Sequence, residues 1–221
     1  MKIKWFAHAA FLLEGDGLRI ITDPYMPSRM GFAPITEPAD IVIRSSADDN
    51  AHCYAEMIPG QPVVVTATEI GPDGHRIGDL TIAGIPAQES LVHKETPRDN
   101  ALYRFSLEGL RIAHFGDLGN RLTPEQLAAL AGADVCLVPT GGPPTIELDD
   151  LCDALRLLRP RLTIPMHYQL VGSKIRMLPV TAFTQRFPAD QVTWLDGSEV
   201  ELTRQTLPAE PRILVLQPST I

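Results

Sequence analysis

The order of the apolar segments constrains the fold of this chain more than any other feature. Short apolar runs that predict strands fill the first half, and strands alternate with helices only in the second half. The predicted strands of the first half cover residues 3–6, 10–14, 18–21, 41–43, 62–65, 79–83, 101–107 and 110–114. This order favours two sheets that pack face to face with helices outside, which is a four-layer α/β/β/α sandwich.

Sequence patterns that predict helices begin after the predicted strand at residues 110–114. Thr123, Pro124 and Gln126 form a capping box with proline at the first helical position, which predicts a helix that continues through Ala131. A second helix is expected over residues 148–158, because helical spacing stops there before a proline. Buried strands are expected at residues 135–138 and 162–164.

The end of the chain is predicted to add little to the core. Residues 192–195 and 199–203 are expected to form a last β pair around a turn. Residues 208–221 carry three prolines, so we expect a peripheral tail on a single domain that spans residues 1–221. This tail either packs on its own domain or covers a neighbouring subunit, which leaves a homo-oligomer as one alternative.

Composition argues against several classes of partner. The formal net charge is -8 at pH 7, so no nucleic acid is expected, because phosphate backbones need clustered Lys and Arg. No run approaches the roughly 18 apolar residues of a membrane span, and no secretory signal is expected at the N-terminus. Three cysteines, Cys53, Cys136 and Cys152, match no paired spacing and suit a reducing cytoplasm. We therefore expect a cytoplasmic protein with a small-molecule substrate.

Polar side chains gather where the predicted strands end. These side chains belong to His8, Asp48, Asp49, His52, Glu89, His114, Asp117 and His167. Strand ends are where α/β folds place their sites, because a rigid sheet holds residues that loops present. Each residue alone has an ordinary explanation as a turn residue or a core histidine, so the order of the whole set carries the argument.

That order resembles the metallo-β-lactamase superfamily, in particular its branch of ascorbate-phosphate lactonase-like proteins and predicted hydrolases. The segments that carry the resemblance are Trp5–Leu12, Ile20–Pro24, Ala39–Val42, His114–Gly119, Val138–Thr145 and Ile164–Tyr168. They extend through nearly the whole chain. The resemblance implies the four-layer sandwich and a metal-dependent hydrolase.

The metal motif of that family, H-x-H-x-D-H, is not kept in this chain. Its four ligand positions and the position of the next histidine hold Ser46, Asp48, Asn50, Ala51 and Glu89. The resemblance leaves only Asp117, the usual bridging carboxylate, and His167, a second-site ligand. A normal dinuclear zinc site is not expected, because serine and alanine cannot replace imidazole as ligands.

The remaining residues predict a mixed oxygen and nitrogen site for one divalent ion. The expected ligands are Asp48 or Asp49, His52, Asp117 and His167, with His52 filling a lost position if the loop is shifted by one residue. Two imidazoles with carboxylates suit manganese, iron or zinc. Such an ion would activate a water against a small ester, lactone, amide or phosphoester.

Carboxylates and polar side chains around the ion complete this hypothesis. Glu89 or the unused aspartate of Asp48 and Asp49 would act as general base beside the ligand Asp117. The residues expected to orient the ligands or line the pocket are His8, Asp23, His93, Arg98, Asn100 and His114.

Two further hypotheses stay open at the level of sequence. The fold could persist without a metal as a module that binds a ligand or a protein partner, because a fold does not fix a function. Cys53 and His52 could instead perform metal-free acid–base or redox chemistry. That last hypothesis requires Cys53 to be essential.

Overall fold

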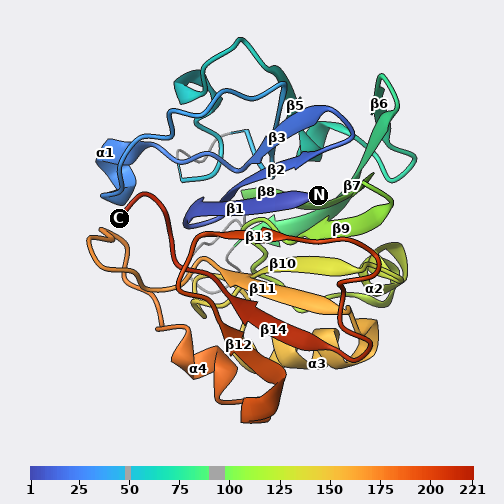
Figure 1. The fold of residues 1–221 in the computed structure, drawn as a ribbon, viewed down its shortest axis with the longest axis vertical. Coiled ribbons are helices and arrows are strands. Elements are labelled where there is room, and N and C mark those ends of the chain that lie inside the picture. The colour runs from blue at the N-terminus through green and yellow to red at the C-terminus, as the bar shows by residue number, and fades with distance from the viewer. Residues whose placement is uncertain (48–50, 90–97) are drawn as a thin grey trace.

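Two mixed β-sheets lie at the centre of the structure (Figure 1). The structure is a computed structural model, and it describes residues 1–47, 51–89 and 98–221, with Arg98 as backbone only. The six-stranded sheet has the order β13 (Glu199–Glu201), β1 (Lys2–Ala7), β2 (Ala10–Gly15), β3 (Leu18–Thr22), β4 (Ile41–Arg44) and β5 (Val63–Thr66). The eight-stranded sheet has the order β12 (Val192–Trp194), β14 (Arg212–Val215), β11 (Leu162–Met166), β10 (Val135–Pro139), β9 (Leu110–His114), β8 (Arg98–Leu107), β7 (Leu80–Glu89) and β6 (His75–Ile77).

The six-stranded sheet is buried on both faces, because successive side chains of its strands belong to two different core clusters. In β1, Ile3 and Trp5 belong to the large core cluster that both sheets share, whereas Phe6 belongs to a smaller outer cluster. In β4, Ile43 belongs to the shared core and Val42 to the outer cluster. Because successive side chains of a strand point to opposite faces, these apolar runs contribute side chains both to the shared core and to the outer cluster. The sandwich predicted from the sequence is confirmed.

Both predicted helices are present. In α2 (Pro124–Leu130) the backbone N–H of Gln126 donates to Thr123 Oγ1 at 3.2 Å, and the Thr123 N–H donates to Gln126 Oε1 at 2.9 Å. α3 (Leu148–Leu158) lies next to α2 beside the eight-stranded sheet (Figure 1). The shorter helices are α1 (Pro27–Met30), α4 (Thr181–Thr184), η1 (Ala55–Met57), η2 (Ala67–Glu69) and η3 (Ala189–Gln191). No helix in the described ranges has the length and apolar character that a bilayer crossing needs.

The predicted last β pair is wrong, because β12 and β13 belong to different sheets. β13 pairs antiparallel with β1, with Ile3 opposite Val200. β12 instead pairs parallel with β14, with Thr193 opposite Leu214. A sequence pattern shows two short strands around a turn. It does not show that each strand finds a more buried partner far away in the chain.

Residues 208–221 are not a peripheral tail. They contain β14, which lies between β11 and β12 and pairs parallel with both. The buried residues of this segment are Ile213, Leu214, Val215 and Leu216. The prolines at 208, 211 and 218 flank the strand and do not interrupt it, so its backbone hydrogen bonds are kept.

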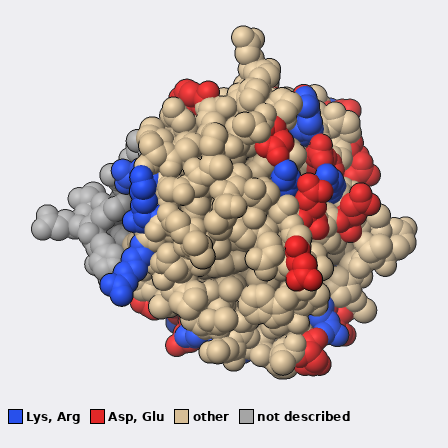
Figure 2. Space-filling model, turned by 60° about the vertical axis from the view of Figure 1, so that its left-hand side comes forward, with Lys and Arg blue, Asp and Glu red and all other residues tan. Residues whose placement is uncertain are grey.

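Charged side chains are unevenly spread over the surface. In the view of Figure 2 they gather mainly toward two sides, and a broad face between them shows few. Ion pairs join the edge of the six-stranded sheet, where Lys2 Nζ lies 2.8 Å from Glu199 and Lys4 Nζ lies 2.5 Å from Glu37. Exposed ion pairs contribute only about 0–1 kcal/mol each. The apolar core, and not the surface charge, therefore holds the two sheets together.

Candidate metal centre

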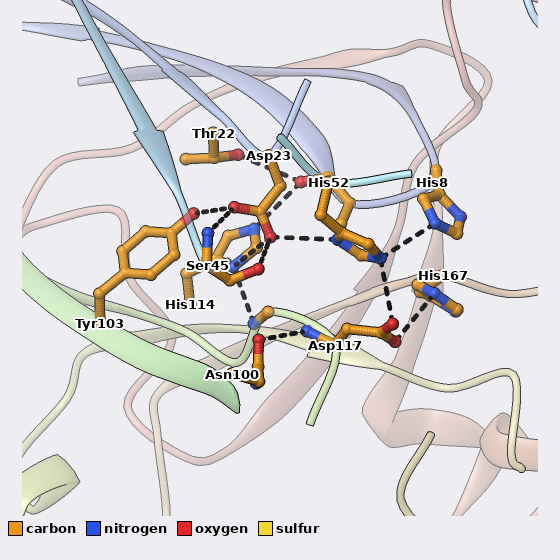
Figure 3. Close-up of polar contacts among 12 residues, drawn as sticks. His8, Thr22, Asp23, Ser45, His52, Asn100, Tyr103, His114, Asp117 and His167 are labelled. Carbon is orange, nitrogen blue, oxygen red and sulfur yellow. Dashed lines mark hydrogen bonds and ion pairs between the residues drawn. The ribbon is translucent and has the colours of Figure 1, made fainter. Parts of the chain in front are cut away.

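Several strands deliver polar side chains to one region of the sandwich (Figure 3). His8 follows β1, Asp23 follows β3, Asp117 lies three residues beyond β9, and His167 follows β11. β3 is parallel to β4, and β9, β10 and β11 are mutually parallel. The carboxyl ends of parallel strands meet at one edge of a sheet, so these side chains converge although the sequence separates them widely.

Three histidines and one aspartate form a compact cluster, which we call the donor cluster: His8, His52, Asp117 and His167. Single donor atoms of the three histidines lie within 4.8 Å of one another. His8 Nε2 and His52 Nε2 are 3.2 Å apart. The Asp117 carboxylate lies close to the rings of His52 and His167. Its Oδ2 is 3.5 Å from His52 Nε2, and its Oδ1 is 3.2 Å from His167 Nε2 (Figure 3). All four side chains are buried.

These separations fit the coordination shell of a small divalent cation. Metal–nitrogen bonds of 2.0–2.1 Å at tetrahedral angles put neighbouring donor atoms about 3.3 Å apart. The three measured separations, 3.2, 3.5 and 3.2 Å, lie around that value. Burial, with the neighbouring rings of His167 and His52, holds the pKa of His8 well below its usual range. A neutral imidazole keeps the lone pair that a metal needs.

Asp23 fixes the orientation of His52. This fully buried carboxylate accepts hydrogen bonds from the Ser45 N–H at 2.8 Å, the Ser45 hydroxyl at 2.7 Å and the Tyr103 hydroxyl at 3.1 Å. Its Oδ2 also lies 3.2 Å from His52 Nδ1. A carboxylate acceptor places the proton on Nδ1, so Nε2 of His52 presents its lone pair to the donor cluster.

His114 lies beside the donor cluster and has both ring nitrogens occupied. Its Nδ1 accepts from the Gly116 N–H at 3.0 Å, so its Nε2 carries the proton and donates to Ala9 O at 3.0 Å. The ring stacks on Tyr103 with centroids 4.7 Å apart. Burial lowers the pKa of His114. A neutral histidine with this bonding joins β9 to the turn after β1 and has no nitrogen left for a metal.

The backbone at three of these positions is left-handed. His8 has φ 53°, Asp23 φ 37° and His167 φ 52°. Non-glycine residues avoid this region, and each such residue costs about 1–3 kcal/mol unless its surroundings hold it there. The backbone itself ties two of them together, because the His167 N–H donates to His8 O at 3.0 Å. Strain of this kind concentrates at functional sites.

Gly116 allows the Asp117 turn to pack against the end of β4. A Cβ at this position would lie 2.5 Å from Ser45 Cβ and 2.8 Å from Asn100 Oδ1, and the φ of Gly116 is +52°. We expect Gly116→Ala to lower the free energy of unfolding by about 2–4 kcal/mol through overpacking and backbone strain. Urea unfolding measures this loss. Gly17→Ala is the control, since Gly17 has φ +74° with nothing within 4 Å. If Gly17→Ala lowered the free energy of unfolding by as much as Gly116→Ala, backbone strain alone would explain the loss and overpacking would not be needed.

The other residues predicted for the site fall into three groups. Asn100 is buried beside the donor cluster, where its Oδ1 accepts from the Asp117 N–H at 3.3 Å. Glu89 is buried at the end of β7, and its backbone forms a bridge with Leu118. Arg98 pairs with Glu89 at the start of β8. The predicted site residues Asp48, Asp49 and His93 lie outside the described residues.

Two residues of the Asp23 network were not predicted from the sequence. Ser45 and Tyr103 both bond Asp23 but were not predicted. The burial of Tyr103 could have been predicted from the sequence, because alternation along the predicted strand 101–107 turns Tyr103 to the same face as Phe105. His8 was predicted to orient ligands or line the pocket, and its Nε2 lies 3.2 Å from Nε2 of His52.

Comparisons with known proteins identify the family of this chain. Residues 2–167 match the family model described as the beta-lactamase superfamily domain. A UPF0173 metal-dependent hydrolase of Archaeoglobus fulgidus is 26% identical over 197 residues, covering 76% of this chain and 83% of the relative. Its counterpart in Carboxydothermus hydrogenoformans is 28% identical over 192 residues, covering 76% and 84%.

Solved structures give a similar result. A Thermotoga maritima protein, assigned to the zinc-dependent hydrolases of the metallo-beta-lactamase superfamily, superimposes with a TM-score of 0.76 and 31% identity over 97% of both chains. Igni18, a metallo hydrolase from Ignicoccus hospitalis, superimposes with a TM-score of 0.58 and 25% identity. That alignment covers 84% of this chain and 89% of Igni18.

Proposed function

Since this chain belongs to the metallo-β-lactamase superfamily and is a metal-dependent hydrolase, we propose that it works with one divalent ion held by His8, His52, Asp117 and His167. The observation that carries this proposal is the donor cluster, whose four buried side chains have separations suited to one ion. The cluster replaces the lost family motif with ligands from the ends of β1 and β11 and from the turns after β4 and β9.

The chemistry of the donors favours zinc or iron for this ion. The sequence alone predicts two imidazoles with two or three carboxylates, a set of donors that also suits manganese. The donor cluster has three imidazoles and one carboxylate. Imidazole suits zinc and iron, whereas manganese prefers carboxylate and water oxygens. We therefore rank zinc first and iron second.

The residues around the ion would divide the work of hydrolysis. A bound divalent ion supplies a lowered pKa for water and polarises a carbonyl or phosphoryl oxygen of the substrate. Glu89 is the proposed general base and would accept the proton of the attacking water at a carboxylate oxygen. Its support is its position, buried at the end of β7, with its backbone bridged to the neighbour of Asp117. Asp23 would keep His52 oriented throughout.

The proposed substrates are small esters, lactones, amides or phosphoesters. All of them carry an oxygen that a metal can polarise and a bond that water can break. The donor cluster also argues against the metal-free binding module. Burying several imidazoles costs free energy unless their polar atoms find partners, and a metal ion would be such a partner. Redox chemistry at Cys53 stays a weaker hypothesis, which full activity of Cys53→Ala would exclude.

Metal content tests the proposal directly. Wild-type protein purified without chelator is expected to hold near-stoichiometric zinc or iron by mass spectrometry, and His167→Ala is expected to hold almost none. His75→Ala is the matched control, because His75 is an exposed histidine of β6. The same three proteins are then assayed on p-nitrophenyl esters, lactones and phosphoesters. Absence of metal in the wild type, even after reconstitution, would overturn the proposed mechanism.

A further inference from the structure

The edge strand β5 has an open side. β5 pairs with β4 and ends the strand order of the six-stranded sheet, so no strand in the described part of the chain pairs with its other side. Two neighbouring apolar residues of β5 are unusually exposed, Val63 at 50% and Val64 at 44%. An edge with free backbone donors and acceptors and exposed valines is a template for another strand.

The exposure pattern indicates what kind of element would cover this edge. Successive residues of a strand face opposite sides of the sheet, so Val63 and Val64 are exposed on opposite faces. A helix or loop laid on one face would cover only one of them. A strand added in the plane of the sheet would contact both and would also satisfy the backbone groups. The geometry therefore selects an extended partner.

Charge selects a second copy of the same chain as that partner. Residues 61–68 contain no charged side chain. Among the other edge strands, β13 carries Glu199 and Glu201, β6 carries Arg76, and β12 is uncharged like β5. Charges on edge strands discourage pairing between molecules. Two copies with a net charge of -8 each approach most easily through strands that carry no charge themselves.

We propose that two copies of this chain form a symmetric dimer through antiparallel pairing of β5 with β5. A two-fold axis through Val64 places Val64 opposite its own copy and Val63 opposite Val65, because antiparallel pairs keep a constant sum of residue numbers. The two six-stranded sheets then become one continuous sheet. This inference is independent of the proposed function, since the donor cluster takes no residue from β5.

A shallow groove beside β5 supports this register. The groove has a volume of about 540 Å³, and its lining includes the apolar residues Ala55, Ile58, Pro59 and Val64 together with the charged Arg44 and Glu56. Residues directly opposite each other in an antiparallel pair point to the same face. The Val64 side chain of the second copy would therefore enter the apolar part of this groove, which gives the contact a buried centre.

Light scattering coupled to size exclusion tests the dimer. The full chain is expected to be dimeric at micromolar concentration. In Val64→Lys the dissociation constant should rise about 100-fold or more, because two ammonium groups would face each other across the axis and lose water. The control is Trp194→Lys on β12, an edge strand of the other sheet, where the side chain is 50% exposed against 44% for Val64. Trp194→Lys should stay dimeric.

Three results would overturn the proposal: a monomeric wild type, a Val64→Lys variant that stays dimeric, or a Trp194→Lys variant that dissociates. Circular dichroism and urea unfolding show whether each variant is folded before its mass is read. Metal content is unaffected by any of these outcomes, so failure of the dimer and failure of the hydrolase are distinguishable.

Disulfide trapping tests the register separately. Opposite residues of an antiparallel pair have Cα atoms about 4.5–5.5 Å apart, within the range of about 4.4–6.8 Å that a disulfide spans. Val64→Cys should therefore crosslink with its own copy on oxidation, and Val63→Cys should not. Background is low, because Cys53, Cys136 and Cys152 are buried, and burial raises the pKa of Cys136 to about 12 and that of Cys152 to about 11. Equal crosslinking of both variants, or none of Val64→Cys, would contradict the register.

Discussion

His8→Ala is expected to bind metal at least about 100-fold more weakly than the wild type, since even partners that only orient a ligand cost 10–100-fold when removed. His8 Nε2 lies 3.2 Å from His52 Nε2, at the distance of two donors on one ion. Its ring is fully buried and neutral, so a metal is the partner that best uses its lone pair. Competition against a chelator of known affinity measures the loss, and hydrolase activity at limiting metal should fall with it.

His75→Ala again serves as the control and should keep wild-type affinity. A small cavity at position 8 also costs stability, so the metal-free forms of the variant and the wild type are compared by urea unfolding. If His8→Ala kept wild-type affinity, His8 would not be a ligand, and the cluster would reduce to His52, Asp117 and His167. Added metal that restores activity to the variant at high concentration would support a weakened site.

Asp23→Asn is the second substitution with a large expected effect, on both metal affinity and stability. The carboxylate accepts from Ser45 and Tyr103 and lies against His52 Nδ1. An amide replaces one of its acceptor oxygens with a donor, so a buried donor loses its partner, at a cost of about 3 kcal/mol in the free energy of unfolding. Metal affinity should fall about 10–100-fold, because His52 is no longer held in one tautomer and orientation.

Asp134→Asn separates these two effects. Asp134 is also buried and accepts from Arg111, by the backbone N–H at 2.8 Å and by Nε at 3.2 Å, but it lies outside the donor cluster. This control should lose stability and keep metal affinity. If Asp23→Asn behaved in the same way, Asp23 would stabilise the fold without positioning His52.

Local patterns in the sequence predicted most of the first half of the fold. β1 to β4 and β9 follow from short apolar runs and turn residues, and α2 follows from a capping box that the structure contains in full. These features need only neighbouring residues. The partners of β12, β13 and β14 were missed, because each pairs with a strand more than ten residues away in the chain and no local pattern records such a pairing.

The residues of the candidate site also differ in how well the sequence predicted them. Position at strand ends and the family resemblance selected His52, Asp117 and His167, and the structure brings these three together. Position at a strand end also selected His8, as a residue that orients ligands or lines the pocket, but did not show that its ring reaches His52. Its ring position depends on a left-handed backbone with φ 53°, and a histidine flanked by alanines gives no signal for that conformation.

The pairing of β1 with β13 has a consequence for how this protein is made. β1 is translated before the strand that completes its pairing, because one of its two neighbours is formed by Glu199–Glu201. Further bonds to β1 come from Ser219 and Thr220, whose N–H groups donate to Trp5 O and Phe6 O. During translation, at about 5–20 residues per second, the nascent chain therefore exposes an unfinished sheet edge for roughly ten seconds or longer. We expect this edge of β1 to stay unpaired until residues 199–201 have emerged.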